Sequence, residues 1–204
     1  MRRGWTILLA FLFLGNVSAA LMAEEMDVDS KQWTEQYDPI FKKYTKRYFG
    51  PFYDWRWFKS QAIAESRLRP NVTSDRGAKG LMQLLPSTFA EIRKLNPHFV
   101  EIDTPRWNIA AGIYYDYYLY RKWDVPSDKD RLLYALASYN AGYSRLLRTM
   151  RRHNLQNSSW LEIKKHLPGQ TRYYVKTIRN LMNDKKHEKR RFRGISKLIL
   201  SQSS

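Results

Sequence analysis

The chain has no cysteine among its 204 residues. This absence excludes a disulfide framework, a thiolate nucleophile and a cysteine-bound zinc site. The four histidines are scattered and show neither an H-E-x-x-H motif nor another ligand spacing, so no metal site is expected. No G-x-x-x-x-G-K-[ST] phosphate loop, dinucleotide fingerprint or G-x-S-x-G elbow occurs either. We therefore expect no cofactor, and a carboxyl group is the remaining candidate for chemistry.

Acidic residues are scarce: 19 Asp and Glu stand against 36 Lys and Arg, which gives a net charge of +17. Such a balance favours an anionic partner. Nucleic acid, an acidic membrane and an acidic cell-wall polymer all carry the required charge. Composition alone does not rank them.

Long hydrophobic runs are absent except at the N-terminus, where an apolar stretch covers residues 5–14. Arg2 and Arg3 precede it and small residues follow up to Ala23, the pattern of a secretory signal peptide over residues 1–23. An uncleaved anchor or a buried first helix are the alternatives. Cleavage could follow Ala19, Ala20 or Ala23, and cleavage after Ala23 would remove both arginines and leave a net charge of +15. The pattern predicts export to the periplasm or cell envelope, so nucleic acid is not expected as a partner.

The rest of the chain reads as successive helices with little strand-like alternation, which predicts an all-α domain. Segments 33–49 and 52–66 show helical periodicity, and a capping box at Thr88–Glu91 is expected to start another helix. A second capping pair, Ser127 with Asp130, precedes a further helix that Gly142 should end. Further helices are expected over residues 106–123 and 144–152, near residues 158–166, and from about residue 171. The predicted divisions are an N-terminal helical segment at 24–50, a catalytic domain at 51–184 and a basic tail at 185–204.

The basic tail holds seven Lys or Arg against one acid between residues 185 and 197. It is either a solvated end of the chain or an electrostatic tether to an anionic surface. Nothing in the sequence indicates the oligomeric state.

Among the carboxyl groups, Glu65 is the candidate that helical spacing indicates. On a helix it shares a face with Phe58 and Ala62, at i, i+4 and i+7, so it should be partly desolvated. Desolvation raises the pKa of a carboxyl group and suits it to general acid and base catalysis. The alternative is a surface residue at a helix end.

The loop after Glu65 is suited to holding a ligand. Gly77 and Gly80 allow tight bends and a close approach of the backbone. Gln83 offers a donor and an acceptor for a sugar acetamido group, and Met82 an apolar surface for a sugar ring. Alternatively, the "LMQLL" stretch is core with one polar outlier.

Four blocks in this order resemble a known family. "AESRLRPNVTSDRGAKGLMQLLPST" at 64–88 is similar to the catalytic signature of soluble-type lytic transglycosylases, bacterial relatives of goose-type lysozyme. "NIAAGIYY" at 108–115, "ALASYNAG" at 135–142 and "TRYYVKTI" at 171–178 resemble the family's later motifs. Ser138 stands where the family usually has alanine. Gln170 stands where the family often has glutamate, so any contact that this glutamate makes in the family is in doubt here.

The resemblance implies a lysozyme-like domain that cuts the β-1,4 bond between N-acetylmuramic acid and N-acetylglucosamine in peptidoglycan. Glu65 would act as acid and then as base, leaving a 1,6-anhydro end, while the sugar's own acetamido group replaces the second carboxylate. Asp75 is then expected to be a turn residue rather than a second acid. Tyr174 is implied to hydrogen-bond Glu65 and orient it. The residues expected to bind sugar are Ser74, Met82, Gln83, Tyr139 and Asn140. A water-using muramidase and a non-enzymatic basic cell-wall binder are the competing hypotheses.

Overall fold

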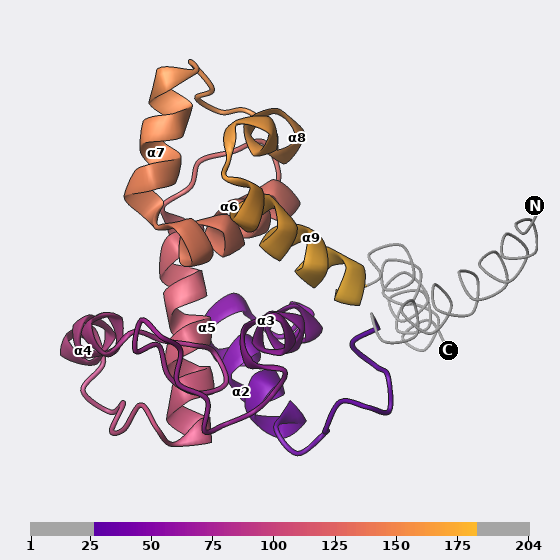
Figure 1. The fold of residues 1–204 in the computed structure, drawn as a ribbon, viewed down its shortest axis with the longest axis vertical. Coiled ribbons are helices and arrows are strands. Elements are labelled where there is room, and N and C mark those ends of the chain that lie inside the picture. The colour runs from indigo at the N-terminus through magenta and orange to yellow at the C-terminus, as the bar shows by residue number, and fades with distance from the viewer. Residues whose placement is uncertain (1–26, 183–204) are drawn as a thin grey trace, which may run out of the picture.

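The computed structural model describes residues 27–182, and helices account for all of its regular structure (Figure 1). Within this range there is no strand, only isolated bridges at Thr73–Lys79 and Lys79–Leu84. The all-α prediction is confirmed. The helices are α2 (Asp38–Phe49), α3 (Arg56–Ser66), α4 (Pro86–Leu95), α5 (Pro105–Arg121), α6 (Asp128–Ala141), α7 (Tyr143–Arg152), α8 (Trp160–Ile163), the 3-10 helix η1 (Lys164–His166) and α9 (Gly169–Met182). The predicted signal peptide and most of the basic tail lie outside the described residues.

Prolines and short polar side chains explain where several helices begin. Proline occupies the first turn of α2, α4 and α5, where its missing N–H costs nothing. The Ser127 side chain accepts a hydrogen bond from Asp130 N, so the cap predicted for α6 is confirmed. The capping box predicted at Thr88 is wrong: α4 begins two residues earlier, because Pro86 with its fixed φ already starts the helix.

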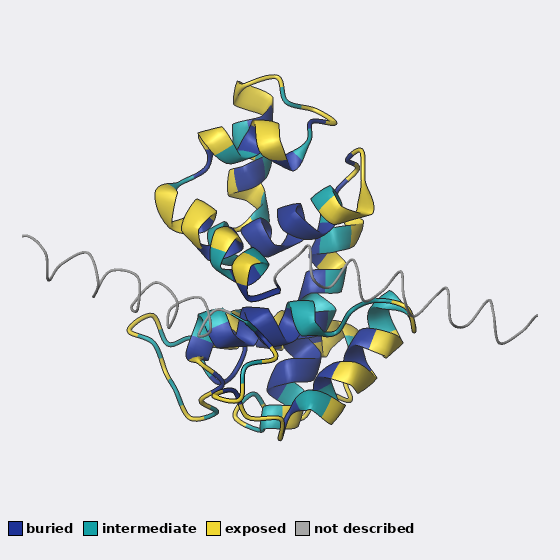
Figure 2. Ribbon diagram, turned by 90° about the vertical axis from the view of Figure 1, so that its right-hand side faces the viewer, coloured by how far each residue is buried: buried dark blue, intermediate teal, exposed yellow. Residues whose placement is uncertain are grey.

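Helix α5 runs through the middle of the molecule and packs against α2, α4 and α6, while α9 packs against α3 and α6. Figure 2 shows that the buried residues line the facing sides of these helices. The side chains of Phe41, Phe58, Ile109, Tyr134 and Val175 are fully buried there. α2 therefore contributes to the same core as the helices that follow it.

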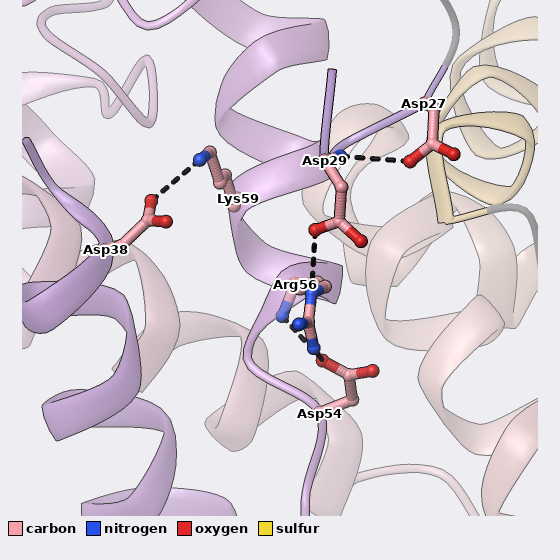
Figure 3. Close-up of polar contacts among 6 residues, drawn as sticks. All are labelled: Asp27, Asp29, Asp38, Asp54, Arg56 and Lys59. Carbon is pink, nitrogen blue, oxygen red and sulfur yellow. Dashed lines mark hydrogen bonds and ion pairs between the residues drawn. The ribbon is translucent and has the colours of Figure 1, made fainter. Parts of the chain in front are cut away.

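The segment before α2 is held against α3 and α9. Val28 N donates to Leu181 O at 2.8 Å, and Asp29 pairs with Arg56 at 2.9 Å. Further along α3, Lys59 makes a 2.7 Å ion pair with Asp38 at the start of α2 (Figure 3). These contacts fix the position of α3, the helix that carries Glu65.

None of the helices described between residues 27 and 182 has the length and hydropathy needed to cross a membrane.

Candidate active site

Glu65 lies in the last turn of α3, where the chain leaves the helix abruptly. Arg67 and Leu68 both adopt positive φ angles, 54° and 57°, which turn the backbone away from the helix axis. Ser66 fixes this turn, because its hydroxyl donates to Leu81 O at 2.8 Å. The end of α3 and the loop that follows it are thereby held together.

The Glu65 carboxyl group is oriented by a residue 109 positions later in the chain. Tyr174 of α9 donates its hydroxyl proton to Glu65 Oε1 at 2.6 Å. Burial raises the pKa of Glu65 from 4.5 to about 7, although the Tyr174 hydrogen bond lowers it. Desolvation therefore outweighs the hydrogen bond, and the carboxyl group can both give and accept a proton near neutral pH.

The glycine loop is tied to α5 through Asn108. Its Oδ1 accepts from Met82 N at 2.7 Å, and its Nδ2 donates to Lys79 O and Ile102 O at 2.9 and 3.0 Å. Gly80 has a φ of +74°, and a Cβ there would lie 2.5 Å from the Asn108 side chain. A glycine is therefore required on both backbone and steric grounds.

Ser74 and Gln83 both shape this loop. Ser74 Oγ accepts from Ala78 N at 3.0 Å, and Gln83 Nε2 donates to Val72 O and Gly80 O, each at 3.0 Å. Both side chains keep partial exposure. Their present hydrogen bonds hold the loop, and sugar binding by either residue stays a prediction.

Met82 occupies the core side of the loop. Its side chain is fully buried, and a Cβ on Gly112 of α5 would lie 2.7 Å from it. It therefore has no exposed surface for a sugar ring, and its side chain has a packing role. Its carbonyl oxygen accepts from the Tyr139 hydroxyl at 2.8 Å, which connects the loop to α6.

Asn140 lies on α6 next to Tyr139 and is bonded to α9. Its Oδ1 accepts from Thr171 Oγ1 at 3.0 Å, and the Asn140 side chain remains partly exposed. The structure thus brings Tyr139, Asn140 and Tyr174 together on the neighbouring faces of α6 and α9.

Asp75, in contrast, is exposed in the loop.

A second carboxyl group, missed in the sequence, lies in the core beneath this site. Asp116 of α5 is completely buried, and Gln61 of α3 donates to its Oδ1 at 3.3 Å. Burial raises the pKa of Asp116 well above its usual range, and the Glu65 charge raises it further. The available signal was its register: Ile109, Gly112 and Asp116 recur at helical spacing on the core-facing side of α5.

Comparison with known proteins identifies the family. The model of the Transglycosylase SLT domain matches residues 43–161. The chain belongs to this family. The match includes Glu65 and the loop but ends before α9, so Tyr174 lies beyond it.

Relatives of the SLT family agree in sequence and fold. Membrane-bound lytic murein transglycosylase F of Actinobacillus succinogenes is 33% identical over 160 residues, covering 73% of this chain and 32% of the relative. The protein of the same name from Pseudomonas putida is 33% identical over 170 residues, covering 80% and 33%. The 70 kDa soluble lytic transglycosylase of Escherichia coli superposes with a TM-score of 0.63 at 26% identity, covering 74% of this chain and 24% of that one.

The chain spans about one third of the length of these curated relatives. The predicted family and the predicted lysozyme-like fold are both confirmed by these matches.

Proposed function

We propose that this protein is a lytic transglycosylase of peptidoglycan that works in the cell envelope. The observation that carries the proposal is the partly exposed Glu65, whose pKa is raised to about 7 by burial and whose carboxyl group is oriented by Tyr174. SLT-family membership and the names of its relatives point to the same substrate. The basic surface would concentrate the protein on a polymer rich in carboxylates.

In the first step, protonated Glu65 gives its proton to the glycosidic oxygen between N-acetylmuramic acid and N-acetylglucosamine, and the C1–O bond breaks. The acetamido oxygen of the muramyl residue stabilises the positive charge at C1. In the second step, ionised Glu65 takes the proton of the C6 hydroxyl as this oxygen attacks C1. No water is consumed, the product carries a 1,6-anhydro ring, and Glu65 is again protonated.

A single catalytic carboxyl group is consistent with the surroundings of Glu65. Ordinary glycosidases place a second carboxylate at the reacting carbon or at the attacking water. Asp116 cannot serve in that way, because it is completely buried and reaches neither substrate nor solvent. Participation of the substrate's acetamido group supplies what a second carboxylate would otherwise provide.

Mass spectrometry of digested sacculi tests this function. The transglycosylase releases muropeptides that are about 18 Da lighter than those of a hydrolase, by the mass of one water. Reducing ends would instead identify a muramidase that uses water. The matched variant Glu65→Gln should fold and still bind sacculi but release nothing; if it released muropeptides at the wild-type rate, Glu65 would not be the catalytic acid.

The remaining parts of the proposal are narrower. We propose that Tyr139, Asn140, Ser74 and Gln83 line the sugar subsites, and that residues 1–23 direct export to the periplasm. Tyr139 and Asn140 are supported by their position between Glu65's loop and α9. Single alanine variants assayed on purified glycan strands test the four binding residues, and N-terminal sequencing of the mature protein tests the signal peptide.

A further inference from the structure

A line of tyrosines leads away from the candidate active site along the face of α5 that carries Tyr115, Tyr118 and then Lys122. Tyr139, which is bonded to the glycine loop, lies against Tyr115 with ring centroids 5.4 Å apart. Tyr115 in turn lies nearly parallel to Tyr118, with centroids 6.2 Å apart and an interplanar angle of 14°. Tyr115 is partly exposed and Tyr118 is 40% exposed. The line therefore starts at the catalytic loop and ends in solvent.

A lysine continues this line to the start of α7. The Lys122 ammonium lies 4.7 Å from the Tyr118 ring centroid and 4.8 Å from that of Tyr143. Lys122 is exposed and makes no ion pair within the described part of the chain, while Tyr143 is partly exposed. Gly142, with a φ of +88°, makes the turn between α6 and α7, and Tyr143 is the first residue of α7. Two aromatic rings thus hold one cation at the surface, free to meet an anion.

This arrangement differs from ordinary core packing of tyrosines. Tyr48 and Tyr114, for example, interact on the inner side of α5 where it packs against α2. By contrast, Tyr118 of α5 and Tyr143 of α7 are at least partly exposed, and Lys122 lies close to both rings. An exposed aromatic ring suits the apolar face of a sugar, and a lysine held by cation–π contacts suits a carboxylate.

We propose that Tyr118, Lys122 and Tyr143 form an additional binding site for carboxylated glycan strands, continuous with the catalytic site through Tyr115 and Tyr139. The two tyrosines stack on sugar rings, and Lys122 pairs with a carboxylate of the muramyl residue or its stem peptide. The proposal rests on the proposed function for its choice of ligand. It assigns to this site the ability to distinguish a carboxylated strand from a neutral one.

Binding measurements in the uncleaving Glu65→Gln background test the site. The two probes are purified peptidoglycan strands that carry stem peptides, and neutral oligomers of β-1,4-linked N-acetylglucosamine. Adding Tyr118→Ala should weaken the binding of both probes by roughly fivefold, because stacking does not depend on the carboxylate. Adding Lys122→Gln should weaken only the carboxylated strand, by about the same factor, and should reduce the salt dependence of its binding.

Two matched variants control for general effects. Lys46→Gln removes one exposed lysine charge from α2, and Phe52→Ala removes an aromatic ring that is 80% exposed elsewhere. Neither should change the binding of either probe by more than the experimental error. Thermal denaturation shows whether each variant is folded.

The proposed site would be overturned if the Tyr118→Ala and Lys122→Gln variants each bound both probes as tightly as their Glu65→Gln parent does. Equal weakening of both probes by Lys122→Gln would overturn the carboxylate preference. In the enzyme with Glu65 intact, Lys122→Gln should raise KM for sacculi without lowering kcat. Because binding is measured without turnover, the site would stand even if wild-type protein failed to produce anhydro ends.

Discussion

Glu65 and Asp116 show how the degree of burial affects the protonation of a carboxyl group. Glu65 keeps partial contact with solvent and has a tyrosine donor that stabilises its ionised form. Asp116 is completely buried, and within residues 27–182 its one hydrogen-bond donor is the Gln61 amide. The first can therefore exchange a proton near neutral pH, whereas burial raises the pKa of Asp116 well above its usual range and so favours its neutral form.

Tyr174→Phe should shift the pH profile of the enzyme toward higher pH. The lost hydrogen bond favoured ionised Glu65, so the pKa of Glu65 should rise above about 7 by roughly one unit. The alkaline limb of kcat/KM, where the required acid becomes deprotonated, should move by the same amount. We also expect kcat to fall by about 10- to 100-fold, because the carboxyl group loses its orientation. An alkaline limb that stays in place in a pH–rate profile would contradict this role of Tyr174.

The same pKa shift has a consequence for stability. The folded-state pKa of Glu65, about 7, lies above the unfolded value of 4.5, so folded protein binds the proton more tightly between these pH values. The free energy of unfolding should therefore fall as pH rises from about 4.5 to about 7, by at most about 3 kcal/mol. Glu65→Gln removes this cost and should be more stable than wild type at pH 8, but not at pH 4, in urea denaturation.

Asp116→Asn should preserve the stability that Asp116→Ala loses. Within the described residues, the buried Asp116 Oδ2 atom has no hydrogen-bond partner, and a proton on it would make it a donor instead of a buried charged acceptor. Asparagine can donate in the same place, so the cost at neutral pH should stay under about 1 kcal/mol, whereas alanine leaves a cavity and an unpaired amide and should cost about 2–4 kcal/mol. The folded-state pKa of Asp116 is raised, so wild type should lose stability toward alkaline pH while the asparagine variant does not. Urea denaturation at pH 6 and pH 9 measures this; equal losses in both variants would show that Asp116 is not a neutral donor.

At the scale of single elements, α3 carries both the candidate catalytic residue and two residues that form ion pairs. Its last turn carries Glu65, and earlier turns carry the two ion-paired residues drawn in Figure 3. Lys59 and Asp38 have only 4% and 13% of their side-chain surfaces exposed, whereas Arg56 and Asp29 have 30% and 31%. The same helix therefore offers a buried ion pair and a half-exposed one for direct comparison.

Lys59→Met should destabilise the fold far more than Arg56→Gln. Removing Lys59 leaves the Asp38 carboxylate poorly solvated and unpaired, which costs about 3–5 kcal/mol for buried pairs. Removing Arg56 breaks contacts that solvent can replace, so about 0–1 kcal/mol is expected. Chemical denaturation of both variants measures the difference, and Lys59→Met combined with Asp38→Asn should recover part of the loss. Similar costs for the two single variants would show that burial does not decide the strength of these pairs.

Sequence patterns predicted elements well where local rules decide them. The Ser127 cap and the break at Gly142 follow from short-range chemistry, and both are present. The start of α4 was misplaced because Pro86 competes with the Thr88 capping signal. The Tyr174–Glu65 contact came from family resemblance, since helical spacing cannot relate residues 109 positions apart. Asp116 was missed because its burial depends on α3, which only the folded structure places against it.

At the scale of the whole molecule, positive charge is spread widely rather than concentrated in the tail. Residues 1–26 hold two basic and two acidic residues, and residues 183–204 hold seven basic and two acidic ones. The 156 residues between them therefore carry a net charge of +12 of the total of +17. Helix α7 alone presents exposed arginines at 145, 148, 151 and 152. The positive charge available to attract an anionic polymer thus lies on the described domain as well as on the tail.

Deleting residues 185–204 should accordingly weaken binding to sacculi without abolishing it. The truncated Glu65→Gln protein keeps most of the charge, so it should still bind at low ionic strength and be released at a moderately lower salt concentration. Replacing Arg148, Arg151 and Arg152 by glutamine in the full chain should lower the release concentration further when combined with the deletion, because both sets of charges act on the same polymer. Co-sedimentation with sacculi over a salt series measures this, and turnover of short soluble glycan strands by the active truncated enzyme should be unchanged. Complete loss of binding at low salt on deletion alone would show that the tail is the tether, since the net charge of +11 that residues 1–184 carry would then be unable to hold the protein on the sacculi.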